Sequence, residues 1–240
     1  ERTSNRHVLA AHNEDWLPDD EPDVFLVHAK PEDEPAFLAM TYGGLLPNIG
    51  FNEFGLAQCC DTVYPRDCRI GIPRIIVSRA VLAAEIPSEA IRATVVPHRA
   101  AGYNHVLVHE SGEIYSVEVS ARQMAVLYAE DGYMVHTNHY LDAMMRGVED
   151  GSDELISTRV RYFRALRLLK QNNRHTLNTL QGILRDHINY RDAICNHDYS
   201  NDNVMDREKT IVSMIMDLTE RRLYAAWGNP CCNEYAEYSL

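Results

Sequence analysis

Short apolar runs separated by polar turns make up most of the first half of the chain. Each run has the length and the bounding turn residues typical of a β-strand. The predicted strands are residues 6–11, 24–27, 36–42, 49–52 and 56–63. The segment NEFG at 52–55 places Gly55 where a tight turn needs a left-handed residue, so we expect a hairpin there. This part of the chain therefore predicts an antiparallel sheet.

The spacing of apolar positions changes after residue 73, where a helical period replaces the strand pattern. Helices are predicted at 73–83, from Ser88 onward, and at 158–169 and 176–188. Further strands are predicted at 104–109, 114–120, 123–128, 210–217 and 222–227. This order lacks the sustained strand–helix alternation of a parallel sheet. The order of elements instead fits two packed antiparallel sheets with helices outside, in a single domain over residues 1–240.

Composition and charge narrow the functional classes. The chain has 240 residues, enough for one large core, and a formal net charge of −12. Nucleic-acid binding needs a basic face, so this charge argues against it, and it weighs against polyanionic substrates unless a local basic pocket exists. No apolar stretch approaches the roughly 18 residues of a membrane helix. The polar residues 1–7 do not resemble a signal peptide, so we expect a cytoplasmic protein.

Cysteine usage gives no sign of a disulfide framework or of a metal site. The chain has six cysteines, in two adjacent pairs and two single positions, and no CxxC spacing. They are expected to be mostly reduced, buried thiols; Cys195 and Cys231 are nucleophiles only in principle. His105 and His109 have zinc-helix spacing, but on a strand they stand roughly 13 Å apart. Neither a cofactor nor a metal is therefore expected.

Three motifs place hydrogen-bonding side chains at the ends of apolar runs. They are AHNEDW at 11–16, GFNEFGLA at 50–57 and VHTNHYL at 135–141. Asp15 is expected in the turn after the first strand, where a carboxylate can pair with an ammonium or orient a thiol. Asn138 is expected at the end of the strand-like run 134–137, where its NH2 group is a suitable oxyanion donor. Asp61 and Thr62 end another strand and complete the wall.

In this order and spacing, the motifs resemble the penicillin acyltransferase-like (peptidase C45) branch of the N-terminal-nucleophile hydrolases. More distantly they resemble the bile-salt and penicillin V hydrolases, and the likeness covers nearly the whole chain. The resemblance implies an α+β fold, a four-layer αββα sandwich, and autocatalytic processing ahead of a cysteine nucleophile. It gives Asp15 the carboxylate role and Asn138 the oxyanion role.

The chain departs from the family pattern at four points. The family cysteine falls about four residues before Glu1 by the family spacing. His12 stands where relatives carry Gln or Arg. Asp61 stands where relatives have an asparagine of the oxyanion hole, which leaves the second donor open. Asn196 stands where the penicillin-forming relatives have arginine, which weakens any transfer of their substrate specificity.

The sequence thus predicts an N-terminal-cysteine amidohydrolase that cleaves a linear amide and matures by self-cleavage. An acyltransferase from acyl-CoA to an amine, and an inactive binding relative, are the alternatives. The expected partners are a small-molecule amide, the chain's own cleaved N-terminal segment and a second copy of the chain in a homo-oligomer, with no nucleic acid and no membrane. The basic stripe of residues 159–170 is expected to be a solvated helix face. The expected catalytic residues are Asp15, Asn138, His12 and Asp61, and the expected substrate-binding residues are Thr62, His139 and Asn104.

Overall fold

Two antiparallel sheets form the centre of the protein, seen in a computed structural model that describes residues 2–151, 155–199 and 207–240. The larger sheet has seven strands in sequence order from β2 to β8, and the smaller has four in the order β1-β9-β10-β11. The larger sheet contains β2 (Phe25–Ala29), β3 (Phe37–Thr41), β4 (Ile49–Asn52), β5 (Leu56–Asp61), β6 (Tyr103–His109), β7 (Ile114–Val119) and β8 (Met124–Tyr128). The smaller contains β1 (Leu9–Trp16), β9 (Lys209–Asp217), β10 (Arg222–Trp227) and β11 (Ala236–Ser239).

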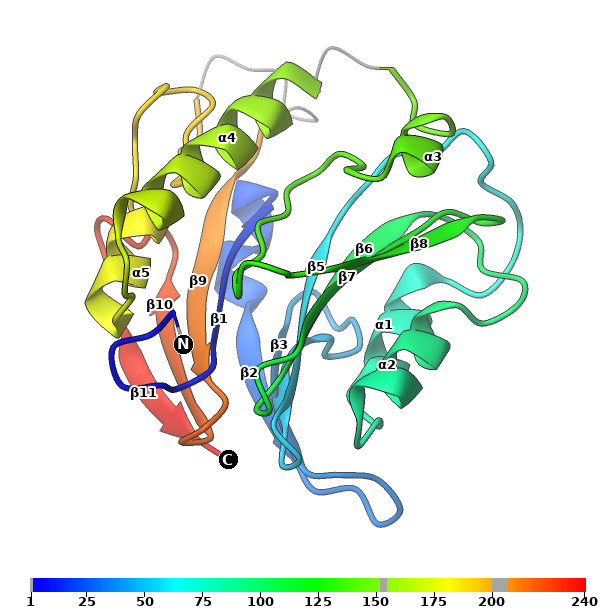
Figure 1. The fold of residues 1–240 in the computed structure, drawn as a ribbon, viewed down its shortest axis with the longest axis horizontal. Helices are drawn as coiled ribbons and strands as arrows, with labels where there is room; N and C mark the ends of the chain where they lie inside the picture. The colour runs from blue at the N-terminus through cyan, green and yellow to red at the C-terminus, as the bar shows by residue number, and fades with distance from the viewer. Residues whose placement is uncertain (1, 152–154, 200–206) are drawn as a thin grey trace.

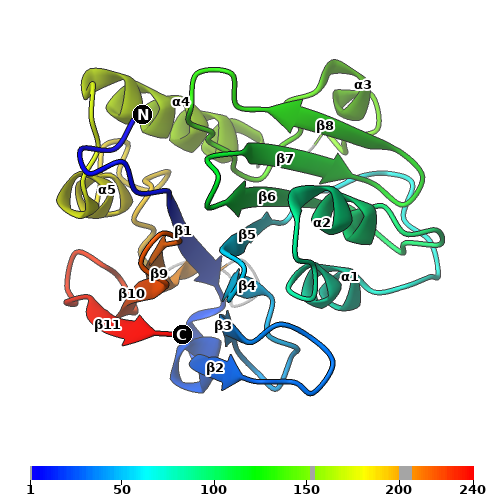
Figure 2. The same cartoon turned by 60° about the horizontal axis from the view of Figure 1, so that its bottom comes forward.

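Helices cover the outer face of each sheet, which gives four layers (Figure 1, Figure 2). On one side, α1 (Arg74–Val81) and α2 (Pro87–Thr94) lie against the seven-stranded sheet, where α2 contacts β6 and β7. On the other side, α5 (Leu177–Leu184) contacts β1 and β9, and α4 (Leu155–Gln171) packs beside it. The short helices η1 (Pro18–Asp23) and α3 (Ala143–Arg146) lie in connections. The predicted αββα sandwich is confirmed.

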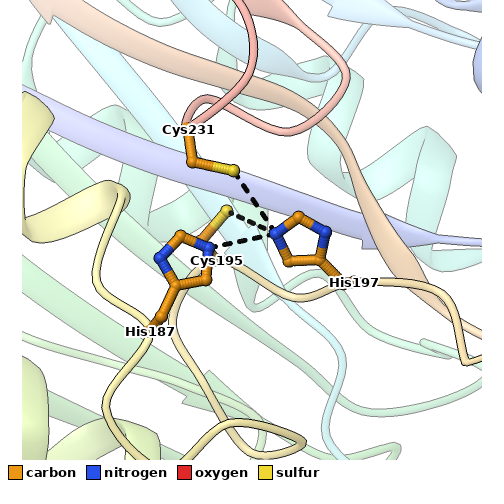
Figure 3. A group of neighbouring side chains, drawn as sticks. All are labelled: His187, Cys195, His197 and Cys231. Atoms are coloured by element: carbon orange, nitrogen blue, oxygen red, sulfur yellow. Dashed lines mark hydrogen bonds between the residues drawn. The ribbon is translucent and has the colours of Figure 1, made fainter.

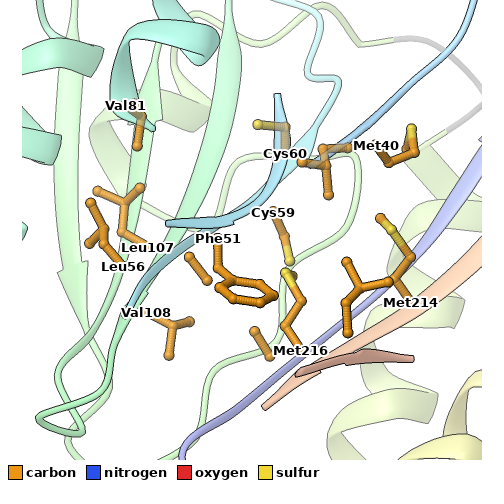
Figure 4. Close-up of a cluster of buried hydrophobic side chains, with 14 of the residues drawn as sticks. Met40, Phe51, Leu56, Cys59, Cys60, Val81, Leu107, Val108, Met214 and Met216 are labelled. Carbon is orange, nitrogen blue, oxygen red and sulfur yellow. The ribbon is translucent and has the colours of Figure 1, made fainter. Parts of the chain in front are cut away.

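The hydrophobic core lies between the two sheets (Figure 4). Met40 and Phe51 come from the larger sheet, Met214 and Met216 from the smaller, and all four are fully buried. Because both inner faces are apolar, stacking the sheets removes both from water at once, which is the main free-energy gain of the fold. The core thus fixes the distance between the sheets and the cavity at their edge.

Most of the predicted elements are confirmed. The hairpin turn at 52–55 joins β4 to β5, and Gly55 has a φ of +71° there. The predicted helices correspond to α1, α2, α4 and α5, and the predicted final hairpin to β9 and β10. The structure adds α3 and β11, which the sequence pattern did not predict because one is a single turn and the other is short and mostly exposed.

Two predictions about the polar motifs are wrong. The first strand is not residues 6–11 but Leu9–Trp16, so Asp15 lies in a strand and not in the turn after it. The polar residues stay extended because β1 pairs with β9 over its whole length, with one irregularity between Glu14 and Asp15. Residues 134–137 do not form a strand. Asn138 is held instead from α4, by a backbone hydrogen bond of 2.7 Å to Thr158 Oγ1.

All six cysteines are free thiols, but only half of them are buried. Cys59, Cys60 and Cys195 lie inside, as expected, whereas the expectation fails for the exposed residues Cys68, Cys231 and Cys232. None of the helices in the described ranges has the length and apolar character needed to cross a bilayer.

Candidate active site

A cavity of about 650 Å³ opens beside the free edge of β1. All eight residues of β1 line it, since the strand pairs with β9 on one side only. The facing wall comes from the end of β5 and from residues 132–138, and α4 and α5 close one side. Of the predicted site residues, the structure brings His12, Asp15, Asp61, Thr62 and Asn138 onto this one surface.

His12 and Glu14 project from the same face of β1, because side chains two residues apart on a strand point the same way. His12 Nε2 lies 2.8 Å from Glu14 Oε2, and the Tyr42 hydroxyl donates to Glu14 Oε1 at 3.2 Å. Burial opposes the charge on His12, but the hydrogen bond and charge of Glu14 outweigh it and raise the pKa of His12. The pair therefore places a hydrogen-bonded histidine and carboxylate together on the wall, and sequence reasoning missed Glu14.

Asp15 is a half-buried carboxylate whose charge is only partly compensated. The Thr210 hydroxyl donates to Asp15 Oδ1 at 2.6 Å. Burial raises the pKa of Asp15 to about 6, while the positive charge of Arg161 and the Thr210 hydrogen bond hold it down. Keeping this group ionised at neutral pH costs on the order of 3 kcal/mol relative to water. A carboxylate held at such a cost is poised to bind a cation or a proton.

His136 bridges two buried carboxylates. Its Nδ1 lies 3.2 Å from Asp61 Oδ2 and its Nε2 lies 3.0 Å from Glu118 Oε1, and the imidazole is fully buried. Burial would lower the pKa of His136, but the two carboxylates raise it to about 9. Burial likewise opposes ionisation of Asp61, yet its contacts with His136, together with a hydrogen bond from Asn104, lower the pKa of Asp61. Asp61 is thus an ionised acceptor with no proton to donate.

Asn138 is fixed in one orientation by partners at both ends of its amide. Its Nδ2 donates to the Thr62 carbonyl at 3.1 Å, and its Oδ1 accepts from Arg161 Nη2 at 2.9 Å. An arginine has only donors, so this contact settles which end of the amide is oxygen. The second Nδ2 hydrogen has no partner among the described residues and remains available at the cavity wall.

Arg161 was expected on a solvated helix face, and for this residue the expectation is wrong. It lines the cavity, bonds Asn138 and lowers the pKa of Asp15. Arg159, Arg167 and Lys170 of the same stripe are exposed, as expected. The helical period places residue 161 on the side of α4 that carries the buried Thr158, three residues earlier, and that spacing was the available signal.

His139 and Asn104, which the sequence predicts to bind substrate, are not among the residues that line the cavity. His139 Nδ1 lies 3.0 Å from Thr158 Oγ1, and the ring packs edge-on against Tyr162. Asn104 is fully buried and donates to Asp61 Oδ2 at 2.9 Å. Both residues sit behind the wall, where they position other groups.

Asn13 leaves an unpaired acceptor at the cavity. Its Nδ2 donates to the carbonyls of Leu184 and Ile194 at 3.0 and 2.9 Å, whereas its buried Oδ1 has no partner within the described ranges. Leaving a buried acceptor unpaired costs about 1–3 kcal/mol, so this position favours a donor supplied from outside the described residues.

None of the four cysteines in or near the cavity is placed or activated as a nucleophile. Cys59 and Cys60 line the cavity, but burial raises the pKa of both thiols well above the ordinary range. Cys195 and Cys231 do not line it. Since the thiolate is the reacting form, none of these four is suited to attack a substrate in the cavity.

Comparisons with known proteins show the family and the fold. A family model described as acyl-coenzyme A:6-aminopenicillanic acid acyl-transferase matches residues 2–231. No curated protein matches the chain. Among solved structures, the chain is similar to penicillin V acylase from Agrobacterium tumefaciens, with a TM-score of 0.64 and 16% identity over 94% of this chain and 80% of that one.

Two further structures share the fold. A mutant of conjugated bile acid hydrolase from Clostridium perfringens has a TM-score of 0.64 at 13% identity, over 100% of this chain and 95% of that one. The N-acylethanolamine-hydrolyzing acid amidase ortholog from Caenorhabditis elegans has a TM-score of 0.59 at 14% identity, over 90% of each chain. At these identities the likeness establishes the fold.

We expect the substitution Arg161→Gln to raise the pKa of Asp15, because it removes the opposing positive charge; the rise should be about one pH unit. Carbon-13 NMR titration of the aspartate carboxyls measures it, with the Asp15→Asn spectrum identifying the resonance. Arg167→Gln is the matched control, since this exposed residue lies on the same helix. An unchanged Asp15 midpoint in Arg161→Gln would contradict the assigned coupling.

Proposed function

This chain belongs to the acyl-coenzyme A:6-aminopenicillanic acid acyl-transferase family, and on that premise we propose that it hydrolyses a small linear amide through an acyl-enzyme. The nucleophile is an N-terminal cysteine in the segment that precedes Glu1, released by self-cleavage. The observation that carries the proposal is the cavity at the free edge of β1. There a carboxylate with a pKa near 6 faces the same space as a fixed amide with a free N–H.

The local geometry supports a nucleophile in that position. Residues 3–7 form a turn in which Arg6 N donates to the Thr3 carbonyl at 3.5 Å and Thr3 Oγ1 donates to the His7 carbonyl at 2.6 Å. The proposed cysteine precedes this turn by about as many residues as His12 and Asn13 follow it. If the turn joins a hairpin, the cysteine lies opposite His12 and Asn13. Arg2 and Thr3 line the cavity, which supports an approach of the preceding chain to this space.

Asp15 serves the α-amine of this cysteine. An α-amine has a pKa near 8, so it can accept the thiol proton and carry a positive charge beside Asp15. The thiolate sulfur attacks the amide carbonyl, and the tetrahedral intermediate collapses with cleavage of the C–N bond. The leaving amine takes the proton from the ammonium. Water, deprotonated by the amine, then attacks the thioester and releases the acid and the thiol.

Asn138 donates its free N–H to the oxyanion that forms in both steps. The contacts from Thr62 and Arg161 prevent the amide from reorienting, so no reorganisation is needed when the charge develops. The positive charge of Arg161 on the amide oxygen also makes the N–H a stronger donor. Asp61, ionised and held by His136, acts as an acceptor for the leaving amine or its ammonium.

His12 and Thr62 contact the substrate on either side. The Nδ1 of His12 has no hydrogen-bond partner in the described part of the chain, so this nitrogen is available to the cysteine sulfur or to the substrate. The Thr62 hydroxyl oxygen accepts a hydrogen bond from Arg74 at 3.1 Å, so its hydrogen can be donated to an acceptor in the cavity. These polar groups suit an amide, whose two ends offer one acceptor and one donor.

Hydrolysis is favoured over transfer because water is the smallest acceptor and needs no second binding site. Three arginines line the cavity, and each is already engaged. Arg161 bonds Asn138, and Arg74 bonds Thr62 and lies over the face of Tyr103. Arg2 bonds the Asp131 carbonyl and lies over the face of Tyr133. The net charge of −12 gives no long-range attraction for a polyanionic donor. Acyl transfer from acyl-CoA to an amine, or binding without catalysis, remain the alternatives that the assays below distinguish.

Replacing Asn138 should slow turnover by roughly 10²–10³, the effect of removing one oxyanion donor. Asn138→Ala removes both the donor and the Arg161 partner, whereas Asn138→Asp keeps an acceptor for Arg161 and removes the donor. We expect both variants to lose kcat while their thermal unfolding midpoints stay close to that of the parent. A wild-type kcat in Asn138→Asp would show that Asn138 acts only by holding Arg161.

The choice between hydrolysis and transfer is tested with a panel of N-acyl amides and the matching acyl-CoA donors, each with and without amine acceptors. We expect the fastest reaction to be hydrolysis of an amide. Faster transfer from any acyl-CoA than hydrolysis of every amide would assign the chain to the acyltransferase alternative. No turnover in any arm, with the mature N-terminus verified by mass, would support the binding alternative.

A further inference from the structure

Two histidines and two cysteines from two connections of the fold lie close together (Figure 3). His187 follows α5, Cys195 and His197 belong to the segment between α5 and β9, and Cys231 lies in the loop between β10 and β11. One ligand atom from each residue lies within 4.8 Å of all the others. None of the four lines the active-site cavity.

We propose that these four residues form a structural zinc site. His187 and His197 bind through imidazole nitrogens, and Cys195 and Cys231 bind as thiolates. Two thiolates neutralise the two charges of the ion, and a tetrahedral set of two sulfurs and two nitrogens is the ligand combination that zinc prefers.

All six ligand-to-ligand distances are within 4.8 Å, and the three measured from His197 Nε2 are close to the edges of a tetrahedron around one ion. Zinc–nitrogen bonds of about 2.0–2.1 Å and zinc–sulfur bonds of about 2.3 Å give ligand-to-ligand edges of roughly 3.3–3.8 Å. His187 Nε2 lies 3.0 Å from His197 Nε2, and His197 Nε2 lies 3.7 Å from Cys195 Sγ and 3.3 Å from Cys231 Sγ. Each of these edges is within a few tenths of an ångström of the tetrahedral range.

The surroundings of the cluster hold its ligands in place. Asn229 Nδ2 lies 3.5 Å from Cys195 Sγ, a contact typical of a metal-bound thiolate, and the same group donates to the Asn196 carbonyl at 2.6 Å. Arg185 Nε donates to the Pro230 carbonyl at 2.7 Å, which ties the end of α5 to the loop that carries Cys231. The ligands are thus preplaced by contacts that need no metal.

A metal here would stabilise the wall that holds Asp15. Asn196, between two ligands, donates from its backbone to Thr210 Oγ1 at 3.0 Å, and Thr210 donates to Asp15. The Ile194 carbonyl, next to Cys195, accepts from Asn13 at 2.9 Å. Sequence patterns did not indicate this site because Cys231 lies 34 residues after His197, and the other three ligands lack a CxxC or HxxxH spacing. The discounted pair His105 and His109 shares no residue with it.

The test is the metal content of the full-length protein, purified under reducing conditions with zinc present and then desalted. Elemental mass spectrometry should find about one zinc per chain, the stoichiometry of a single four-ligand site. Cys231→Ser should weaken zinc binding by about tenfold or more, and His197→Gln should do the same. Cys232→Ser is the matched control, since Cys232 is the exposed neighbour of Cys231 and lies outside the cluster.

Stability and spectroscopy give independent readouts. A chelator should lower the thermal unfolding midpoint of the parent and of Cys232→Ser, because a ligand bound only by the folded state stabilises that state. It should have little effect on Cys231→Ser, an exposed position whose substitution leaves the core intact. Cobalt in place of zinc should give the visible absorption of a tetrahedral thiolate site in the parent and in the control.

Three results would overturn the proposal. One is a reduced parent protein that binds no zinc. Another is zinc content that survives Cys231→Ser but is lost in Cys232→Ser. The third is a purified mass lower by two hydrogens with Cys195 and Cys231 linked in one peptide, which would assign the cluster to a disulfide. None of these results depends on the proposed amidohydrolase activity.

Discussion

The arrangement of the active site depends on one constraint: β1 is hydrogen-bonded to β9 along its full length and to no other described strand. Pairing on one side keeps a polar sequence extended, and the unpaired side gives all eight of its residues a place on the cavity wall. An unpaired strand edge inside a protein is a template for another strand. We propose that the segment carrying the nucleophile pairs with this edge, where Asp15 and Asn13 line the cavity.

The second feature is how buried charge is balanced around the cavity. His136 lies between Asp61 and Glu118, and His12 pairs with Glu14, so each of these three carboxylates contacts a histidine. Breaking such a buried pair by removing one partner costs several kcal/mol, so the network holds its geometry firmly. Asp15 stands apart, because Arg161 and Thr210 offset its burial only in part. An ammonium group bound beside Asp15 would supply the positive charge that this carboxylate lacks.

The fold was predictable from the sequence because its elements are strongly patterned. Alternating apolar runs, a glycine with positive φ at Gly55 and helical spacing after residue 73 are local properties, and the layers follow from them. Local patterns failed for β1, where polar residues are extended only because β9 lies beside them. Asp15 and Asn138 could be singled out from their motifs. Arg161, Glu14 and Glu118 could not, since their importance lies in contacts between segments far apart in the chain. The same limit hid the cluster of His187, Cys195, His197 and Cys231.

The most direct test of the proposed mechanism is to trap the acyl-enzyme and map it. Full-length protein is mixed with an amide substrate, quenched in acid within the first turnover, digested and analysed by mass spectrometry. We predict that the added acyl mass lies on a peptide that begins with cysteine and continues into Glu1–Arg6. Acyl mass on Cys59, Cys60, Cys195 or Cys231, or amide turnover by a chain that retains an uncleaved N-terminal segment, would contradict the mechanism.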